Sequence, residues 1–283
     1  MNTAVLGNGK IVKADEYSAD LHGHRLSCID KNCAAPLIYM PKTETRGAHF
    51  KTTGKMDSKH STDCGFYEPL SVLQAIKKVA EYQEDLLQKG VKETIIRLNL
   101  NRLDPDYVAR TVERKPKEEE KEEVKTKETN SQPSNISSVK TVAKLMTSYE
   151  PDQLASILIN VGGGRKVPLS SIVVDQETAH QMLWSDQTLN VGYFVFGTIE
   201  KVTRLEKVIY IDFEPVNEVT FTLVIFEKYF KHFTYKDDEL KGFEIIVYGM
   251  LKKNDHHGRS KTEMVIKSNK YIDKIKRVVR GAE

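Results

Sequence analysis

All three cysteines of the chain lie in one N-terminal stretch, and no other feature of the sequence constrains folding more strongly. The order is Cys28-x4-Cys33, then 26 residues, then His60-x3-Cys64. An odd number of clustered cysteines argues against a disulfide framework. Two pairs of thiolate and imidazole donors match the ligand set of a structural zinc site instead. We therefore expect residues 1–67 to fold around one Zn²⁺ held by Cys28, Cys33, His60 and Cys64.

The identity of the fourth ligand stays open, because His49 precedes Phe50 in a position similar to that of His60. A catalytic zinc keeps one coordination position free, so four protein ligands indicate a structural role. Residues 1–67 offer few core-forming side chains, so metal binding is expected to supply on the order of 10 kcal/mol of folding free energy. The competing interpretation is three reduced cysteines without a metal.

Four stretches around these ligands are similar to the N-terminal zinc module of CoiA-like competence proteins. They are GKIVKADE, RLSCIDKNCAAPLIYM, RGAHFKTT and HSTDCGF, and together they cover about residues 4–67. The resemblance implies that Cys28, Cys33 and Cys64 are metal ligands, and it keeps both His49 and His60 as candidates for the fourth. It also implies a DNA-processing setting, in a bacterium or a phage.

In that family a nuclease domain often follows the module, and its core needs one acid on a strand and an acid-x-Lys on the next. The run Glu239-Leu240-Lys241 matches the second element, and Asp212 lies upstream. However, DDELKG is typical of a turn rather than a strand. We therefore predict no catalytic residues, and a divergent metal-dependent nuclease remains an alternative.

Composition divides the rest of the chain into three parts. Residues 68–110 are predicted to be a helical extension, because apolar side chains recur at helical spacing between Glu68 and Lys89. Residues 111–137 contain almost no large apolar side chain, which predicts a disordered, charged linker. Residues 138–283 are predicted to form a β-rich domain that begins with a helix capped by Ser138 and ends in a basic C-terminal helix, Asn269 to Arg280.

Five strand-length runs in this domain are rich in β-branched and aromatic residues. They are VGYFVFGTIEKV, KVIYIDFE, EVTFTLVIFE, FEIIVYGML and EMVIKS, with a connection after the third that is expected to form a short helix. This is the order of an OB-fold barrel. The predicted fold class is therefore α+β, with a small zinc-stabilised module plus helix, a flexible charged linker and a C-terminal OB-like β-barrel domain.

Charge on the predicted domain favours a nucleic-acid partner. Between Lys252 and Glu283 there are ten Lys and Arg against four Asp and Glu, although the whole chain carries only +3. An OB barrel binds across its second and third strands, between the loops that join strands one to two and four to five. The expected contacts are Arg204 and Lys207 on the first loop, Lys252, Lys253, Arg259 and Lys261 on the second, and Tyr210 for base stacking.

We therefore predict a non-enzymatic nucleic-acid-binding protein, with single-stranded DNA favoured. The alternative is an interaction factor, phage-encoded or defence-associated, whose OB-like domain binds a partner protein. No apolar run approaches the roughly 20 residues that span a bilayer, and the first residues lack a signal-peptide pattern. We expect a cytoplasmic protein without a membrane partner.

Overall fold

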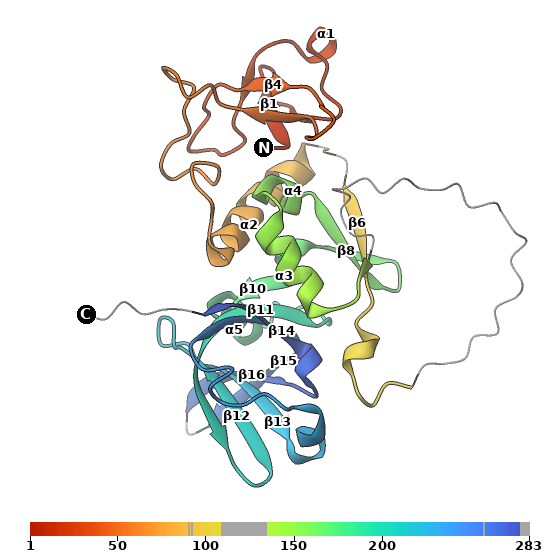
Figure 1. Ribbon diagram of the computed structural model, residues 1–283, viewed down its shortest axis with the longest axis vertical. Helices are drawn as coiled ribbons and strands as arrows, with labels where there is room; N and C mark the ends of the chain where they lie inside the picture. Colours follow the sequence, from red (N-terminus) through yellow and green to blue (C-terminus); the bar gives the residue numbers. More distant parts are fainter. Residues whose placement is uncertain (90, 92, 109–134, 257, 278–283) are drawn as a thin grey trace, which may run out of the picture.

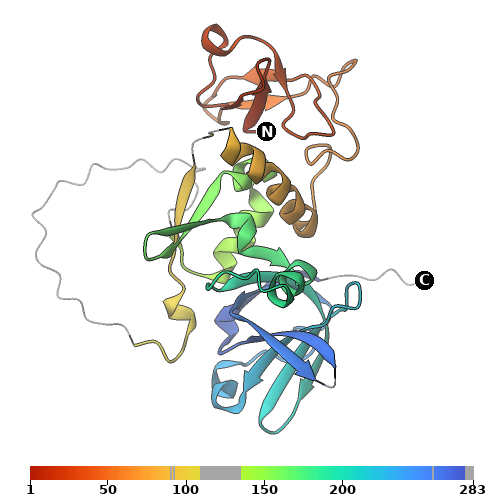
Figure 2. The same ribbon diagram turned by 180° about the vertical axis from the view of Figure 1, so that it is seen from behind.

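The computed structural model describes residues 1–89, 91, 93–108, 135–256 and 258–277. The predicted mixture of helices and sheets is confirmed, and strands outweigh helices. Figures 1 and 2 show three parts along the long axis of the molecule. An N-terminal module lies at one end, a middle layer carries most of the helices, and a β-rich part lies at the other end.

The N-terminal module (residues 1–67) is built from strands of only two to four residues. A three-stranded antiparallel sheet has the order β2-β1-β3, and β4 pairs with β5 in a separate ribbon. Sheets this small bury little apolar surface and are marginal alone. The elements are β1 (Thr3–Leu6), β2 (Ile11–Lys13), α1 (Ala19–His22), β3 (Leu26–Ser27), β4 (Ile38–Met40) and β5 (His49–Lys51).

The middle layer packs three helices against a four-stranded sheet of order β7-β6-β8-β9. The two predicted helices are confirmed as α2 and α3, and the Ser138 hydroxyl caps α3 by accepting from the Thr141 N–H. The elements are α2 (Val72–Gln88), β6 (Thr94–Leu98), η1 (Asn101–Leu103), β7 (Asn135–Ile136), α3 (Val139–Ser148), α4 (Pro151–Ala155), β8 (Ile157–Gly162) and β9 (Arg165–Pro168).

This sheet joins residues from both sides of the predicted linker. Strand β6 comes from the segment predicted as a helical extension, and it pairs in parallel with β7 and β8. The prediction of a disordered linker falls mostly on residues 109–134, which lie outside the described residues. Residues 68–108 and 135–168 therefore form one layer.

The β-rich part contains one eight-stranded sheet. The five predicted strands are confirmed as β11, β12, β13, β14 and β16. In chain order the elements are η2 (Leu169–Ser171), β10 (Val173–Asp175), α5 (Gln176–Trp184), β11 (Tyr193–Arg204), β12 (Val208–Phe213), β13 (Phe221–Phe226), η3 (Glu227–His232), β14 (Phe243–Gly249), β15 (Leu251–His256), β16 (Arg259–Val265), η4 (Asn269–Tyr271) and β17 (Ile272–Arg277).

The strands of this sheet pair in an order that differs from their order in the chain. Strands β11, β12 and β13 form an antiparallel meander, β16 runs parallel to β13, and β15 is antiparallel to β16. Strand β14 pairs with β11 on the other side. Only Met250 separates β14 from β15, so the sheet must curve back on itself between these two strands.

Two predictions about this part are wrong. The basic C-terminal helix is instead η4 followed by β17, which pairs antiparallel with β14 and satisfies the backbone groups along the edge of that strand. The predicted loop LKKNDHHGRSK instead forms most of a hairpin, with six paired positions between β15 and β16. Among the described residues, no helix has the length and apolar character needed to cross a membrane.

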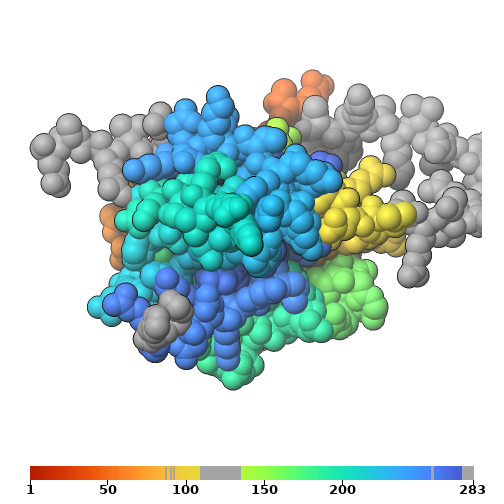
Figure 3. Space-filling model, turned by 90° about the horizontal axis from the view of Figure 1, so that it is seen from below, coloured from red at the N-terminus to blue at the C-terminus, as the bar shows by residue number. Residues whose placement is uncertain are grey.

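Contacts between distant segments join the region around η1 to the β-rich part. Figure 3 shows the segment of η1, in yellow, beside the light-blue residues of η3. The Tyr229 hydroxyl of η3 donates to Asp106 at 2.9 Å, and Lys267 lies 2.5 Å from Asp104. The middle layer therefore touches the β-rich part through this segment.

Candidate metal centre

The structure brings Cys28, Cys33, His60 and Cys64 together, with one donor atom from each and all four within 4.8 Å of one another. The Sγ atoms of Cys28 and Cys64 are 3.7 Å apart, and the His60 Nδ1 lies 3.4 Å from the Sγ atoms of Cys33 and Cys64. Tetrahedral zinc bonds place two sulfurs about 3.8 Å apart, and a sulfur and a nitrogen about 3.5 Å apart. The four residues are therefore a potential metal-binding group whose spacing suits zinc.

His49, the alternative fourth ligand, is not a member of this group. It lies on β5, where its Nδ1 is 2.9 Å from the Gly47 carbonyl oxygen. The short spacing between His60 and Cys64 already favours His60 over His49, because His60 and Cys64 belong to the same short loop.

Two tight turns present the four donor atoms. In the first, the Cys33 N–H donates to the Asp30 carbonyl at 3.0 Å, and the Cys28 N–H donates to that of Ala35 at 2.9 Å. In the second, the Phe66 N–H donates to the Cys64 Sγ at 3.4 Å. An N–H aimed at a sulfur stabilises its thiolate form, so the backbone of this turn already suits a metal-bound cysteine.

Interactions within the group separate the pKa values of its thiols. The hydrogen bond between Cys28 and Cys64 raises the pKa of Cys28, which burial raises further, and lowers that of Cys64 to about 7. Burial lowers the pKa of His60 and favours its neutral form. Thiolate and neutral imidazole are the forms that bind a metal ion.

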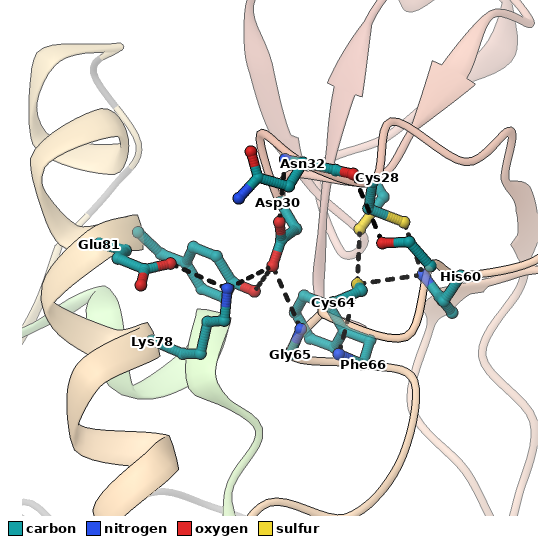
Figure 4. Close-up of polar contacts among 12 residues, drawn as sticks. Cys28, Asp30, Asn32, His60, Cys64, Gly65, Phe66, Lys78 and Glu81 are labelled. Atoms are coloured by element: carbon teal, nitrogen blue, oxygen red, sulfur yellow. Dashed lines mark hydrogen bonds and ion pairs between the residues drawn. The ribbon is translucent and has the colours of Figure 1, made fainter.

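Asp30 is the residue of this centre that the sequence analysis missed. Its buried carboxylate accepts hydrogen bonds from the Tyr82 hydroxyl at 2.6 Å, the Gly65 N–H at 3.1 Å and the Lys78 Nζ at 3.1 Å (Figure 4). Burial alone would raise the pKa of Asp30, but the bond from Tyr82 and the other donors lower it below the usual value. Asp30 therefore links both ligand turns to helix α2.

Two further contacts seat the module on the middle layer. The fully buried Asp152 of α4 accepts from the Thr3 N–H at 2.8 Å and from the Thr3 hydroxyl at 3.0 Å. At Gly65, an added Cβ would lie 2.5 Å from the Tyr82 hydroxyl oxygen, so this approach to α2 requires glycine. The metal centre is thus held against helices rather than suspended on a loop.

The seven predicted nucleic-acid contacts divide into three sets. Arg204 and Lys253 are engaged within the protein, with Arg204 2.7 Å from Asp237 and Lys253 2.6 Å from Asp186. Lys207 is exposed on the turn between β11 and β12. The remaining four, Tyr210, Lys252, Arg259 and Lys261, lie on strands, where their register determines which face they occupy.

That register puts these four residues on one face of the sheet. Asp212 is opposite Thr222, Thr222 is opposite Glu263, and Glu263 is opposite Lys252. Directly paired residues point to the same side, as do residues two apart on one strand. Tyr210 therefore shares the side of Asp212, and Lys261 and Arg259 share the side of Glu263. We call this surface the outer face.

The residues of the nuclease alternative do not meet in a metal-binding group. Asp212 accepts from the Thr222 hydroxyl at 2.7 Å, and Glu239 accepts from the Lys236 N–H at 2.8 Å within a turn. In the part of the chain that the structure describes, three or more possible metal ligands gather only around the three cysteines.

These features define a mixed α/β protein with a potential metal-binding group of three cysteines and one histidine. No family model matches the chain, and no curated protein matches it. Part of the chain is similar to a putative aspartyl-tRNA synthetase from Leishmania major Friedlin, with 8% identity and a TM-score of 0.27 over 39% of this chain and 22% of that one. Part is similar to RecJ in complex with Mn²⁺ from Thermus thermophilus, with 13% identity and a TM-score of 0.24 over 39% of this chain and 17% of that one. The chain thus spans less than a quarter of either protein.

Proposed function

We propose that this chain is a non-enzymatic protein that binds single-stranded nucleic acid, with DNA favoured, and that a structural Zn²⁺ stabilises its N-terminal module. The zinc would be held by Cys28, Cys33, His60 and Cys64. All four positions of a tetrahedral ion are then filled by protein, so the ion would cross-link two turns rather than activate water.

The strand pairing of the β-rich part supports an OB-like barrel. Three antiparallel strands (β11, β12, β13) are followed by the short helix η3. The fifth strand, β16, then lies parallel to the third, and the segment β14–β15 pairs with both the first and the fifth. OB barrels bind oligonucleotides across their second and third strands, which here are β12 and β13.

One observation carries the nucleic-acid proposal: the outer face combines an accessible ring with three basic side chains. Tyr210 is half-buried, while its strand neighbours Ile209 and Ile211 are buried on the opposite side. Among the described residues, Lys252, Arg259 and Lys261 form no ion pair within 4.0 Å. Cations that are not neutralised by the protein remain available to phosphates, and a ring offers a surface on which bases stack.

Binding of a labelled 15-nucleotide oligo-dT, measured by fluorescence anisotropy over a salt series, tests this proposal. The triple variant K252A/R259A/K261A should bind more weakly and should lower the slope of log affinity against log salt by about 2, since each phosphate contact on a single strand contributes about 0.7.

A matched control removes the same charges elsewhere. K144A/R165A/K166A also deletes two lysines and one arginine, all exposed on the middle layer. We expect this variant to keep the affinity and the salt slope of the wild type. Equal effects of the two triple variants, or no oligonucleotide binding by the wild type at low salt, would refute the proposal.

A further inference from the structure

Strand β13 ends in an exposed aromatic side chain. Its first five residues are buried, whereas Phe226 keeps 44% of its surface accessible. An aromatic ring buries a large apolar area when it is covered, so leaving it in water forgoes that stabilisation. Phe226 therefore differs from the five preceding residues of β13 in leaving a large apolar side chain accessible to a ligand.

Phe226 shares the outer face with Tyr210. It lies directly opposite Val208 on β12, and Tyr210 is two residues further along that strand. A diagonal pair of this kind has its positions about 7–8 Å apart, within reach of aromatic side chains. The two aromatic residues thus occupy neighbouring positions on the face opposite the buried Ile209 and Ile211.

The turn beside Phe226 adds an exposed apolar side chain and no net charge. The Glu227 N–H donates to the Lys207 carbonyl at 3.0 Å, which brings the turn between β11 and β12 against the end of β13. Leu205 in this turn is 54% exposed. The turn also carries Glu206, so its own charge is balanced and the excess of positive charge on the outer face lies on the hairpin.

The rings lie toward one end of the outer face and the cations Lys261 and Arg259 toward the other, with Lys252 between them. Along β16, the six steps from Arg259 to Val265 cover about 20 Å, and Val265 pairs with Val224, next but one to Phe226. A single strand laid along this direction would meet the rings at one end, Lys252 at the level of Glu263, and then Lys261 and Arg259 toward the other end. Phosphates supply the charge that complements these cations.

We propose that Phe226 and Tyr210 form a stacking platform for two unpaired bases, and that this platform makes the outer face select single strands over duplex. The inference rests on the proposed function and assigns its specificity. Bases in a duplex are stacked on each other and cannot lie on protein rings, whereas the bases of a single strand can. Cationic contacts alone would bind both forms.

Variants of Phe226 test the platform with the 15-nucleotide oligo-dT and a 15-base-pair duplex. F226A and F226L should each weaken single-strand binding by about 5-fold to 100-fold, because neither side chain has a ring on which a base can stack. The leucine variant keeps apolar area, so it separates the effect of the ring from that of hydrophobic contact. F226W should bind the oligonucleotide at least as well as wild type. Duplex affinity and the salt slope should not change, since no phosphate contact is removed.

The outcomes separate the two levels of the proposal. If wild type binds oligo-dT and F226A binds it equally well, the platform is refuted while the proposed function stands. If F226A weakens single strand and duplex by the same factor, the platform is likewise refuted. If wild type binds neither, the proposed function fails first. Circular dichroism and thermal unfolding of F226A, expected to match wild type at this exposed position, show that the fold is retained.

Discussion

At the scale of single residues, Asp30 explains why the potential metal-binding group has a fixed place in the molecule. Its carboxylate accepts from Gly65, which follows a cysteine of the second ligand turn, and from Lys78 and Tyr82 of helix α2. A buried carboxylate is stable only when it is well paired. The loop between the first two cysteines is therefore tied to helix α2 by charge as well as by packing.

The choice of histidine is a residue-scale prediction. Purified wild-type protein should contain close to one zinc per chain by elemental analysis, and H60A should lose most of it, because three cysteines leave one position of the tetrahedron open. H49A is the matched control and should keep the wild-type zinc content, since His49 lies outside the ligand group. Zinc retained in H60A and lost in H49A would reverse the assignment.

The ligand set was predictable from the sequence, but its supports were not. Two pairs of donors at short spacing encode a zinc site locally. Asp30 stands between two cysteines and carries no such pattern, since its partners Lys78 and Tyr82 lie 48 and 52 residues away. The sequence predicts that Phe226 lies in a strand, but it does not reveal that the side chain of this last strand residue is exposed.

At the scale of elements, locally encoded segments were predictable and those defined by distant partners were not. Helices α2 and α3 have amphipathic periodicity, which predicts them from local sequence. Strand β17 carries apolar residues at helical spacing, yet it pairs with the edge of β14. Strand β15, LKKNDH, is highly polar because it lies at the edge of the sheet order, and lysine is common on edge strands.

The contact between η1 and the end of β16 gives a pH-dependent prediction. Burial would raise the pKa of Asp104, but the hydrogen bond from Lys267 lowers it below its usual value. A folded-state pKa below the unfolded value means that the stabilisation is present above about pH 4 and is lost as pH falls through the folded pKa. D104N should therefore be less stable than wild type by about 1 kcal/mol near pH 7.

Thermal unfolding from pH 2.5 to 7 measures this difference. The two unfolding curves should converge at the acid end, where Asp104 is protonated in wild type as well. In a K267M background, D104N should change the stability little at any pH, since the partner is absent. A gap between wild type and D104N that persists at pH 2.5 would contradict the assignment.

At the scale of the whole molecule, the middle layer links the metal centre to the β-rich part. Asp152 of α4 binds the start of β1, while Asp104 and Asp106 beside η1 bind Lys267 and Tyr229. The same layer contacts both ends, and the buried apolar residues of all three parts form one contiguous cluster. The potential metal-binding group belongs to the module alone, so we expect loss of a bound zinc ion to unfold the module independently of the β-rich part.

Metal removal tests this independence. The chain has a single tryptophan, Trp184, whose Nε1 donates to the buried Thr262 at 3.3 Å in the β-rich part. A chelator should expose residues 1–67 to protease, because the proposed zinc ion would supply much of their folding free energy. The emission of Trp184 should stay unchanged, and re-adding zinc should restore protection. A red shift of the emission in step with zinc loss would show that the two ends unfold together.

The bend at Met250 has a consequence for how the chain folds. Strand β14 pairs with β11, about 50 residues earlier. Strand β15, which follows after Met250, pairs locally with β16, and the other partner of β16 is β13, about 40 residues earlier. Contacts between residues so far apart in sequence are slow to form, because loop closure is entropically costly before they are made. The hairpin that carries Lys252 and Arg259 can form locally, but its pairing with β13 is completed late. A ribosome-bound chain lacking residues beyond 250 has no finished outer face to offer a ligand.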